Sequence, residues 1–168
     1  MTDISTSELR SRLSQVKLLA LDVDGVLTDG GLYYTETGQV LRKFNIKDGQ
    51  GIKLLKQAGV EVAIITAKSA LSTLSRAQDL GITHIFLGVK DKLAQLKTLC
   101  QKLNISLSEV AYVGDDINDL EVLQAVGCPM TVADAMPLNQ SVAIYITKLP
   151  GGQGAVREIC EMLVANCR

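Results

Sequence analysis

Short apolar runs alternate with helical patterns along this chain, and the alternation restricts the folds that the chain can adopt. Five runs are rich in Val, Ile and Leu, as expected of strands covered on both faces; they span residues 17–22, 61–66, 84–87, 109–114 and 130–133. Strands that alternate with helices form parallel βαβ units. The sequence therefore predicts an α/β fold, a Rossmann-like parallel sheet of five main strands with helices on both faces.

Helix signals occupy the segments between these runs. Ser5-x-x-Glu8 is a capping-box pattern, and Gly59 and Gly81 stand where a glycine typically ends a helix. A chain of 168 residues with no internal repeat and no low-complexity linker fits one domain, 1–168, that is long enough to bury a single core. The helices are expected over 5–13, 51–58, 70–80, 92–103, 119–126 and 155–164.

One segment, residues 31–45, interrupts the alternation. Its two arms favour strands and flank a Thr-Glu-Thr-Gly turn, which predicts a β-hairpin between the first strand and the helix that follows it. A projecting hairpin cannot easily bury both of its faces, yet this one carries Tyr33, Tyr34, Leu41 and Phe44. We expect it to pack against another subunit; folding back onto its own domain is the alternative.

Acidic residues cluster directly after two of the apolar runs. Asp22 and Asp24 lie at the end of the first run, and Asp115, Asp116 and Asp119 follow the fourth. Crowded carboxylates repel one another, so such a cluster usually holds a cation between its members. One Asp-x-Asp-Gly could be an ordinary turn, but two acidic clusters at strand ends favour a magnesium site.

Two further polar residues belong to the same edge of the predicted sheet, because ligands bind beyond the carboxyl ends of parallel strands. Thr66 ends the second run, and Lys92 begins the helix after the third. Carboxylate pairs, a hydroxyl and an ammonium at one edge are typical of magnesium-assisted phosphoryl transfer. The metal and the ammonium neutralise a phosphate ester, which would otherwise repel a carboxylate nucleophile.

The amino-acid composition argues against nucleic acid and membranes as binding partners. Basic and acidic side chains nearly cancel, 17 against 18, and the chain has no Trp, so nucleic acid is not an expected partner. No apolar run is long enough to span a bilayer, and the first five residues lack the basic and apolar regions of a leader. We expect a cytoplasmic protein without a membrane partner, whose four Cys are reduced structural thiols.

Four motifs in order resemble the signature motifs of the haloacid dehalogenase superfamily, and its phosphatases in particular. They are Asp22-x-Asp24-Gly25-Val26-Leu27-Thr28, Thr66, Lys92 and Gly114-Asp115-Asp116-x-Asn118-Asp119. The resemblance implies that Asp22 is the nucleophile and forms an aspartyl-phosphate. It also implies that Asp24 protonates the leaving oxygen and then activates water.

The same resemblance assigns the other site residues. Magnesium would be held by Asp22, by the main-chain carbonyl of Asp24 and by Asp115. The remaining roles are phosphate binding by Thr66, Ala67 and Lys92, and outer support of the metal site by Asp116, Asn118 and Asp119.

The segments between the motifs hold a hairpin, helices and a strand but no room for a cap domain. Phe44-Asn45-x-Lys47-Asp48-Gly49 and Gly151-Gly152-x-Gly154-Ala155 resemble the capless 3-deoxy-D-manno-octulosonate 8-phosphate phosphatases. The resemblance implies a phosphorylated sugar-acid substrate, a role in lipopolysaccharide biosynthesis and a homo-oligomer, a tetramer joined through its hairpins. In that family the Gly-rich tail, residues 150–168 here, can fold over a neighbouring active site; a flexible joint to the last helix is the alternative for residues 151–154.

The chain departs from that family after Thr66, where Ala67-Lys68 replaces the usual Gly-Arg. Lys68 keeps the charge but loses the two-pronged donor that pairs with a carboxylate, so the substrate can differ. The resemblance to related capless phosphatases, some with Lys in this region, implies a nononate 9-phosphate of the sialic acid type as the alternative substrate. Lys47 and Asp48 are further candidate substrate contacts, although Asp48 could instead cap a helix. A non-catalytic oligomerisation module is the rival from another class; the retained acidic residues, Thr66 and Lys92 argue against it.

Overall fold

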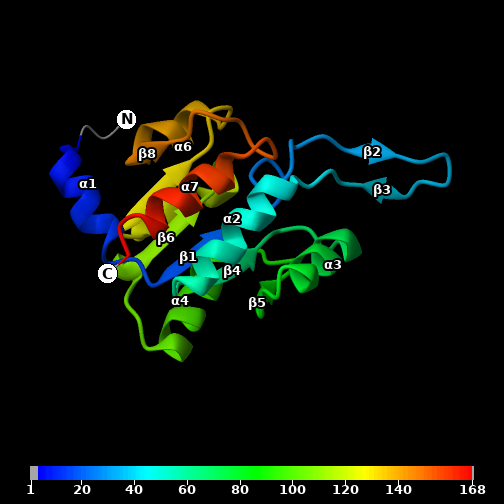
Figure 1. Ribbon diagram of the computed structural model, residues 1–168. Helices are drawn as coiled ribbons and strands as arrows, with labels where there is room; N and C mark the ends of the chain where they lie inside the picture. Colours follow the sequence, from blue (N-terminus) through cyan, green and yellow to red (C-terminus); the bar gives the residue numbers. More distant parts are fainter. Residues whose placement is uncertain (1–3, 168) are drawn as a thin grey trace.

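A parallel sheet forms the centre of the molecule (Figure 1). The computed structural model describes residues 4–167, so residues 1–3 and 168, the two ends of the expected domain, lie outside the described residues. Six strands pair in the order β5-β4-β1-β6-β7-β8, and every neighbouring pair is parallel. The strands are β1 (Leu18–Leu21), β4 (Glu61–Ile65), β5 (His84–Phe86), β6 (Val110–Val113), β7 (Cys128–Thr131) and β8 (Tyr145–Ile146).

The register of the central strands brings three loops to one edge. Leu21, the last residue of β1, pairs with Ile64 of β4 on one side and with Val113 of β6 on the other. The loops that follow these three strands therefore start at nearly the same level. This register places the predicted motif residues side by side at the carboxyl edge of the sheet.

Helices cover both faces of the sheet. Alternate residues of β1 enter two separate cores: Leu19 and Leu21 pack with α2 and α7, whereas Leu18 and Ala20 pack with α4 and α5. Because strand side chains point alternately to opposite faces, a strand buried on both sides must be apolar throughout. The helices are α1 (Thr6–Leu13), α2 (Ile46–Gln57), α3 (Leu71–Asp79), α4 (Lys92–Leu103), α5 (Leu120–Ala125), α6 (Pro137–Val142) and α7 (Ala155–Val164), with short 3-10 turns η1 (Leu107–Glu109) and η2 (Ile117–Asp119).

The fold class is confirmed, with three corrections to its elements. The sheet has a sixth strand, β8, and α6 precedes it; both were missed because they are too short to show a periodic pattern. The strand expected over 130–133 begins earlier, at Cys128. Helix α2 begins at Ile46 rather than at residue 51, because the Asn45 side chain accepts a hydrogen bond from the Lys47 amide at 2.8 Å and caps the helix.

The expected hairpin is present as β2 (Tyr33–Tyr34) and β3 (Val40–Leu41), which pair in antiparallel fashion. It extends away from the sheet (Figure 1). Tyr34 is 68% exposed and Leu41 is 55% exposed, so the hairpin does not fold back onto its own domain. At the base of the hairpin, Phe44 packs against the core.

Within residues 4–167, no helix combines the length and the apolar character that crossing a membrane requires. The longest helices, α2 and α4, have 12 residues each and carry charged side chains on their outer faces. A helix that crosses the hydrocarbon core of a bilayer needs about 20 apolar residues.

Candidate active site

A small pocket of about 150 Å³ lies at the carboxyl edge of the sheet, where β1, β4 and β6 end. It brings together residues that are far apart in the sequence but were all predicted as site residues. The register of the sheet is the cause, because the three loops start side by side. The lining residues are Asp22, Asp24, Thr66, Ala67, Lys68, Asp115, Asp116 and Asn118.

Asp22 and Lys92 form a buried ion pair at the floor of this pocket. Lys92 Nζ lies 2.9 Å from Asp22 Oδ2 and donates a hydrogen bond to Asp119 Oδ1 at 2.6 Å. Burial and, after it, the charge of Asp119 raise the pKa of Asp22 to about 6, although the charge of Lys92 opposes the shift. Burial alone would lower the pKa of Lys92, but the two carboxylates raise it above its usual value, so Lys92 carries its charge.

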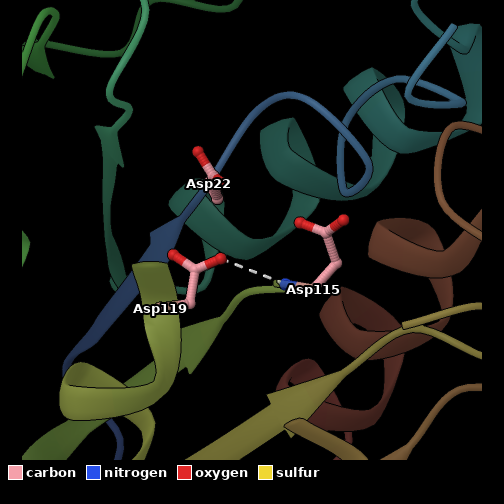
Figure 2. Close-up of side chains that lie close together, drawn as sticks. All are labelled: Asp22, Asp115 and Asp119. Atoms are coloured by element: carbon pink, nitrogen blue, oxygen red, sulfur yellow. Dashed lines mark hydrogen bonds between the residues drawn. The ribbon is translucent and has the colours of Figure 1, made fainter. Parts of the chain in front are cut away.

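Asp119 is fully buried, and both of its carboxylate oxygens accept hydrogen bonds. Oδ1 accepts from Lys92 and from the Tyr112 hydroxyl at 2.6 Å, and Oδ2 accepts from the Asp115 amide at 3.1 Å (Figure 2). Asp119 therefore fixes both the ammonium of Lys92 and the backbone of the 114–119 loop. With its oxygens occupied, it has less to offer a ligand than its neighbours have.

The oxygens that remain free belong to Asp22 and Asp115. Oxygens of Asp22, Asp115 and Asp119 lie within 4.8 Å of one another (Figure 2), and Oδ1 of Asp22 and of Asp115 are buried without a hydrogen-bond partner in the described part of the chain. Burial and the charges of Asp22 and Asp119 raise the pKa of Asp115 to about 7. Free carboxylate oxygens that repel one another are what a divalent cation would satisfy, so the donor set fits magnesium.

Gly25 allows this arrangement. Its φ is +88°, in the left-handed region that favours glycine, and a Cβ at this position would collide with the carboxylate of Asp115. The loop after β1 can therefore approach Asp115 only because residue 25 lacks a side chain.

Thr66 and its neighbours form the wall of the pocket opposite the acidic loop. Thr66 is 2% exposed, and its amide donates to the Phe86 carbonyl at 3.0 Å, which fixes the residue at the end of β4. The Lys68 amide donates to Thr66 Oγ1 at 3.4 Å. Ala67 and Lys68 are exposed at the mouth, where a bound phosphate ester would extend outward.

Arg42 contacts the site although no sequence pattern predicts this contact. Its Nε donates to Asp24 Oδ1 at 2.7 Å and its Nη2 donates to Asp24 Oδ2 at 3.1 Å. The arginine follows β3 on the returning arm of the hairpin, 18 residues from its partner. A single charged residue on a strand-like arm carries no motif signal, so only the three-dimensional path of the hairpin reveals the contact.

Two predicted substrate contacts lie outside the pocket. Lys47 is exposed on the first turn of α2. Asp48 is 1% exposed and accepts a hydrogen bond from the Arg157 amide at 2.8 Å, which supports the alternative of a helix cap, while a contact with substrate stays a prediction. Asp48 caps α7, a helix other than its own, and a carboxylate at a helix N-terminus is also favoured by the helix dipole.

The Gly-rich segment packs on other segments of its own chain. The Gly151 amide donates to Asp134 Oδ1 at 2.9 Å, and the Gly152 amide donates to the Val26 carbonyl at 3.0 Å. A Cβ at either glycine would collide with the backbone of the loop that follows β1. Residues 150–154 therefore support the loop that carries Asp24, and their implied place over a neighbouring active site stays a prediction.

Comparisons with known proteins agree with this geometry. A family model for haloacid dehalogenase-like hydrolases matches residues 47–127. The 3-deoxy-D-manno-octulosonate 8-phosphate phosphatase of Shigella flexneri is 43% identical over 159 residues, which are 95% of this chain and 85% of that protein.

Solved structures agree as well. A crystal structure of the 3-deoxy-D-manno-octulosonate 8-phosphate phosphatase from Moraxella catarrhalis, in complex with magnesium, phosphate and KDO, matches with a TM-score of 0.94 at 40% identity, over 97% of this chain and 94% of that chain. The cobalt-bound enzyme from Haemophilus influenzae matches with a TM-score of 0.88 at 35% identity, over 92% and 91%. This chain therefore belongs to the haloacid dehalogenase-like hydrolases and, within them, to the family of the 3-deoxy-D-manno-octulosonate 8-phosphate phosphatases.

Proposed function

We propose that this chain is a magnesium-dependent phosphatase that hydrolyses 3-deoxy-D-manno-octulosonate 8-phosphate through an aspartyl-phosphate on Asp22. The observation that carries the proposal is the state of the Asp22 carboxylate. One of its oxygens is held by Lys92, and the other is buried, unpaired and in the same pocket as Thr66 and Asp115. Relatives that cover nearly the whole chain carry this activity in their names.

A carboxylate oxygen of Asp22 attacks phosphorus, and the bond from phosphorus to the sugar oxygen breaks. The leaving oxygen takes a proton from Asp24, which reaches the mouth of the same pocket. In the second step, water attacks the phosphorus of the aspartyl-phosphate, its proton passes to Asp24, and phosphate leaves. Lys92 and Thr66 bind the phosphoryl oxygens and stabilise the charge that develops on them.

Magnesium fits the donor set of Asp22 and Asp115 and, when bound, supplies positive charge that offsets the carboxylates and the phosphate. The third expected ligand is the main-chain carbonyl of Asp24. Asp119 orients Lys92 and the 114–119 loop, while Asp116 caps the 3-10 turn η2 by accepting from the Ile117 amide at 2.7 Å. Asn118 lies at the rim of the pocket, within the same turn.

Lys68 is the residue with which we associate the choice of sugar acid. It is exposed at the mouth of the pocket and supplies a point charge where the family usually has the two-pronged donor of an arginine. A nononate 9-phosphate is therefore a second candidate substrate. Both candidates are phosphorylated 3-deoxy-2-ulosonic acids, so the chemistry at phosphorus is the same for the two.

We also infer that copies of the chain assemble through the hairpin into a homo-tetramer, and that the enzyme acts in the cytoplasm in lipopolysaccharide biosynthesis. The exposed Tyr34 and Leu41 support the assembly, because a projecting apolar hairpin is stabilised when a partner covers it. Four free thiols, of which Cys100, Cys128 and Cys160 are buried, suit a reducing compartment.

The test is phosphate release from the eight-carbon and nine-carbon substrates, with and without magnesium, by the native chain and by Asp22→Asn. We expect magnesium-dependent release that is faster for the eight-carbon acid and is lost in the variant. Faster release from the nine-carbon acid would show that the nononate 9-phosphate is the preferred substrate and would associate Lys68 with that preference. Release that persists in Asp22→Asn would contradict the mechanism, and no release from either substrate by the native chain would contradict the proposed function.

A further inference from the structure

The base of the hairpin is attached to the loop that carries Asp24 by several contacts. Thr28 forms an isolated antiparallel bridge with Phe44, and Asp29 receives both the ammonium of Lys43 at 3.1 Å and the Tyr33 hydroxyl at 3.0 Å. These contacts join the hairpin to residues 28 and 29 of that loop. They hold the two arms of the hairpin in a fixed position relative to the end of β1.

The contact between Arg42 and Asp24 differs from these in its burial. The Arg42 side chain is only 7% exposed, whereas that of Lys43, the next residue on the same arm, is 62% exposed. A buried guanidinium that meets both oxygens of a carboxylate in a planar, two-pronged arrangement fixes the orientation of that carboxylate as well as its position. An exposed ion pair such as Lys43–Asp29 fixes the orientation and the position of its carboxylate less firmly.

Asp24 depends on this contact for its orientation. In the part of the chain that the structure describes, the two bonds from Arg42 are the side-chain hydrogen bonds that the Asp24 carboxylate makes. The carboxylate is 27% exposed and lines the pocket, so without Arg42 it would be free to rotate into solvent. A group that exchanges protons with a reacting atom must stay within hydrogen-bond reach of it.

We propose that Arg42 is a positioning residue for Asp24: the hairpin, which is separate from the catalytic sheet, supplies the side chain that holds the proton-transferring carboxylate at the pocket. The inference rests on the proposed function, because Asp24 has a proton to transfer only if the chain hydrolyses a phosphate ester. It adds a residue from outside the four motifs to the catalytic apparatus. It also gives the base of the hairpin a role in turnover.

The test is steady-state hydrolysis of 3-deoxy-D-manno-octulosonate 8-phosphate with magnesium by the native chain, Arg42→Gln and Arg42→Lys. Lys43→Gln is the matched control, since it removes a charge from the same arm without touching Asp24. We expect Arg42→Gln to lower kcat by roughly tenfold to a hundredfold, as misplacement of a catalytic group does, with KM changed by less than about threefold. Arg42→Lys should restore part of kcat, and Lys43→Gln should leave it unchanged.

A double variant separates positioning from a structural effect. If Arg42 acts through Asp24, adding Arg42→Gln to Asp24→Asn should lower turnover by less than Arg42→Gln does alone, because the group to be positioned has already been lost. Thermal unfolding of each variant verifies that it is folded, and Arg42→Lys keeps the test open if Arg42→Gln does not fold.

Other outcomes would overturn the inference. A kcat for Arg42→Gln equal to that of the native chain would remove the positioning role and leave the proposed function intact. A raised KM with unchanged kcat would make Arg42 a substrate contact instead. If Arg42→Gln lowers turnover by the same factor in the native chain and in Asp24→Asn, the role of Arg42 is structural. No hydrolysis by the native chain would overturn the proposed function and the role of Arg42 together.

Discussion

Replacing Lys92 by Met should destabilise the protein strongly, because it leaves two buried carboxylates without their cation. Lys92 is 3% exposed, and its Nζ lies 2.9 Å from Asp22 Oδ2 and 2.6 Å from Asp119 Oδ1. At an effective dielectric constant of about 20, two partners at these distances provide a gross attraction of roughly 12 kcal/mol, of which several kcal/mol offset the desolvation of the ammonium. Methionine fills nearly the same volume, so the cost is mainly electrostatic.

The net loss in the free energy of unfolding should be about 3–5 kcal/mol at pH 7 without magnesium, the cost typical of breaking a buried pair from one side. For a chain of this size, that corresponds to a Tm lower by roughly 6–20 °C. Urea unfolding followed by circular dichroism measures the difference. Glu8→Gln is the control: it breaks the exposed pair with Arg12 on α1 and should cost only about 0.3–0.5 kcal/mol.

Conditions that supply positive charge to the site should reduce the loss in the free energy of unfolding caused by Lys92→Met. Lowering the pH toward 5 protonates Asp22, whose pKa is already raised, and added magnesium compensates its charge. A free energy of unfolding for Lys92→Met within about 1 kcal/mol of the native value at pH 7 without metal would refute the reasoning, since buried carboxylates that lose a needed cation must cost more than an exposed pair does.

Three further predictions concern the metal site, the loop after β1 and α7. The folded-state pKa values of Asp22 and Asp115, about 6 and about 7, lie above the ordinary value of 3.8, so the folded state binds protons more tightly than the unfolded state does. Without metal, the free energy of unfolding should therefore fall as the pH rises from about 4 to 7. Magnesium should make the urea midpoint less dependent on pH. Gly25→Ala should cost about 1–3 kcal/mol of stability and weaken magnesium binding in calorimetry, because its Cβ displaces Asp115; unchanged binding would contradict the packing argument. Asp48→Ala should lower the free energy of unfolding by about 0.5–2 kcal/mol through loss of the hydrogen bond to the Arg157 amide, with KM unchanged. A raised KM would show instead that Asp48 contacts the substrate.

Much of the candidate site was predictable because it depends on regular elements. Apolar runs with a two-sided pattern identify parallel strands, and parallel strands bring the residues at their ends to one edge. Asp22, Thr66 and Asp115 could therefore be grouped before their positions were known, and the pocket does contain them. Lys92 was predicted at the start of α4, where the structure has it.

The rest of the site depends on contacts between distant segments that leave no local signal. Arg42 reaches Asp24 only because the hairpin returns beside the end of β1, and Asp48 meets α7 only because α2 and α7 pack together. The early start of α2, by contrast, has a local cause, the cap by Asn45, and the glycines of the first turns obscured it. Gly51 lowers the helix propensity of that segment. A Cβ at this position would lie 3.0 Å from Arg157 Cα, so the close packing of α2 against α7 favours glycine there although glycine disfavours a helix.

The most direct test of the account is to locate the phosphoryl group on the enzyme. The native chain is mixed with 3-deoxy-D-manno-octulosonate 8-phosphate and magnesium, quenched in acid during turnover, digested and analysed by mass spectrometry. The account predicts that Asp22 gains the mass of one phosphoryl group, and that Asp22→Asn neither gains it nor releases phosphate. A phosphoryl group on another residue, or undiminished release by Asp22→Asn, would contradict the central claim that this carboxylate is the nucleophile.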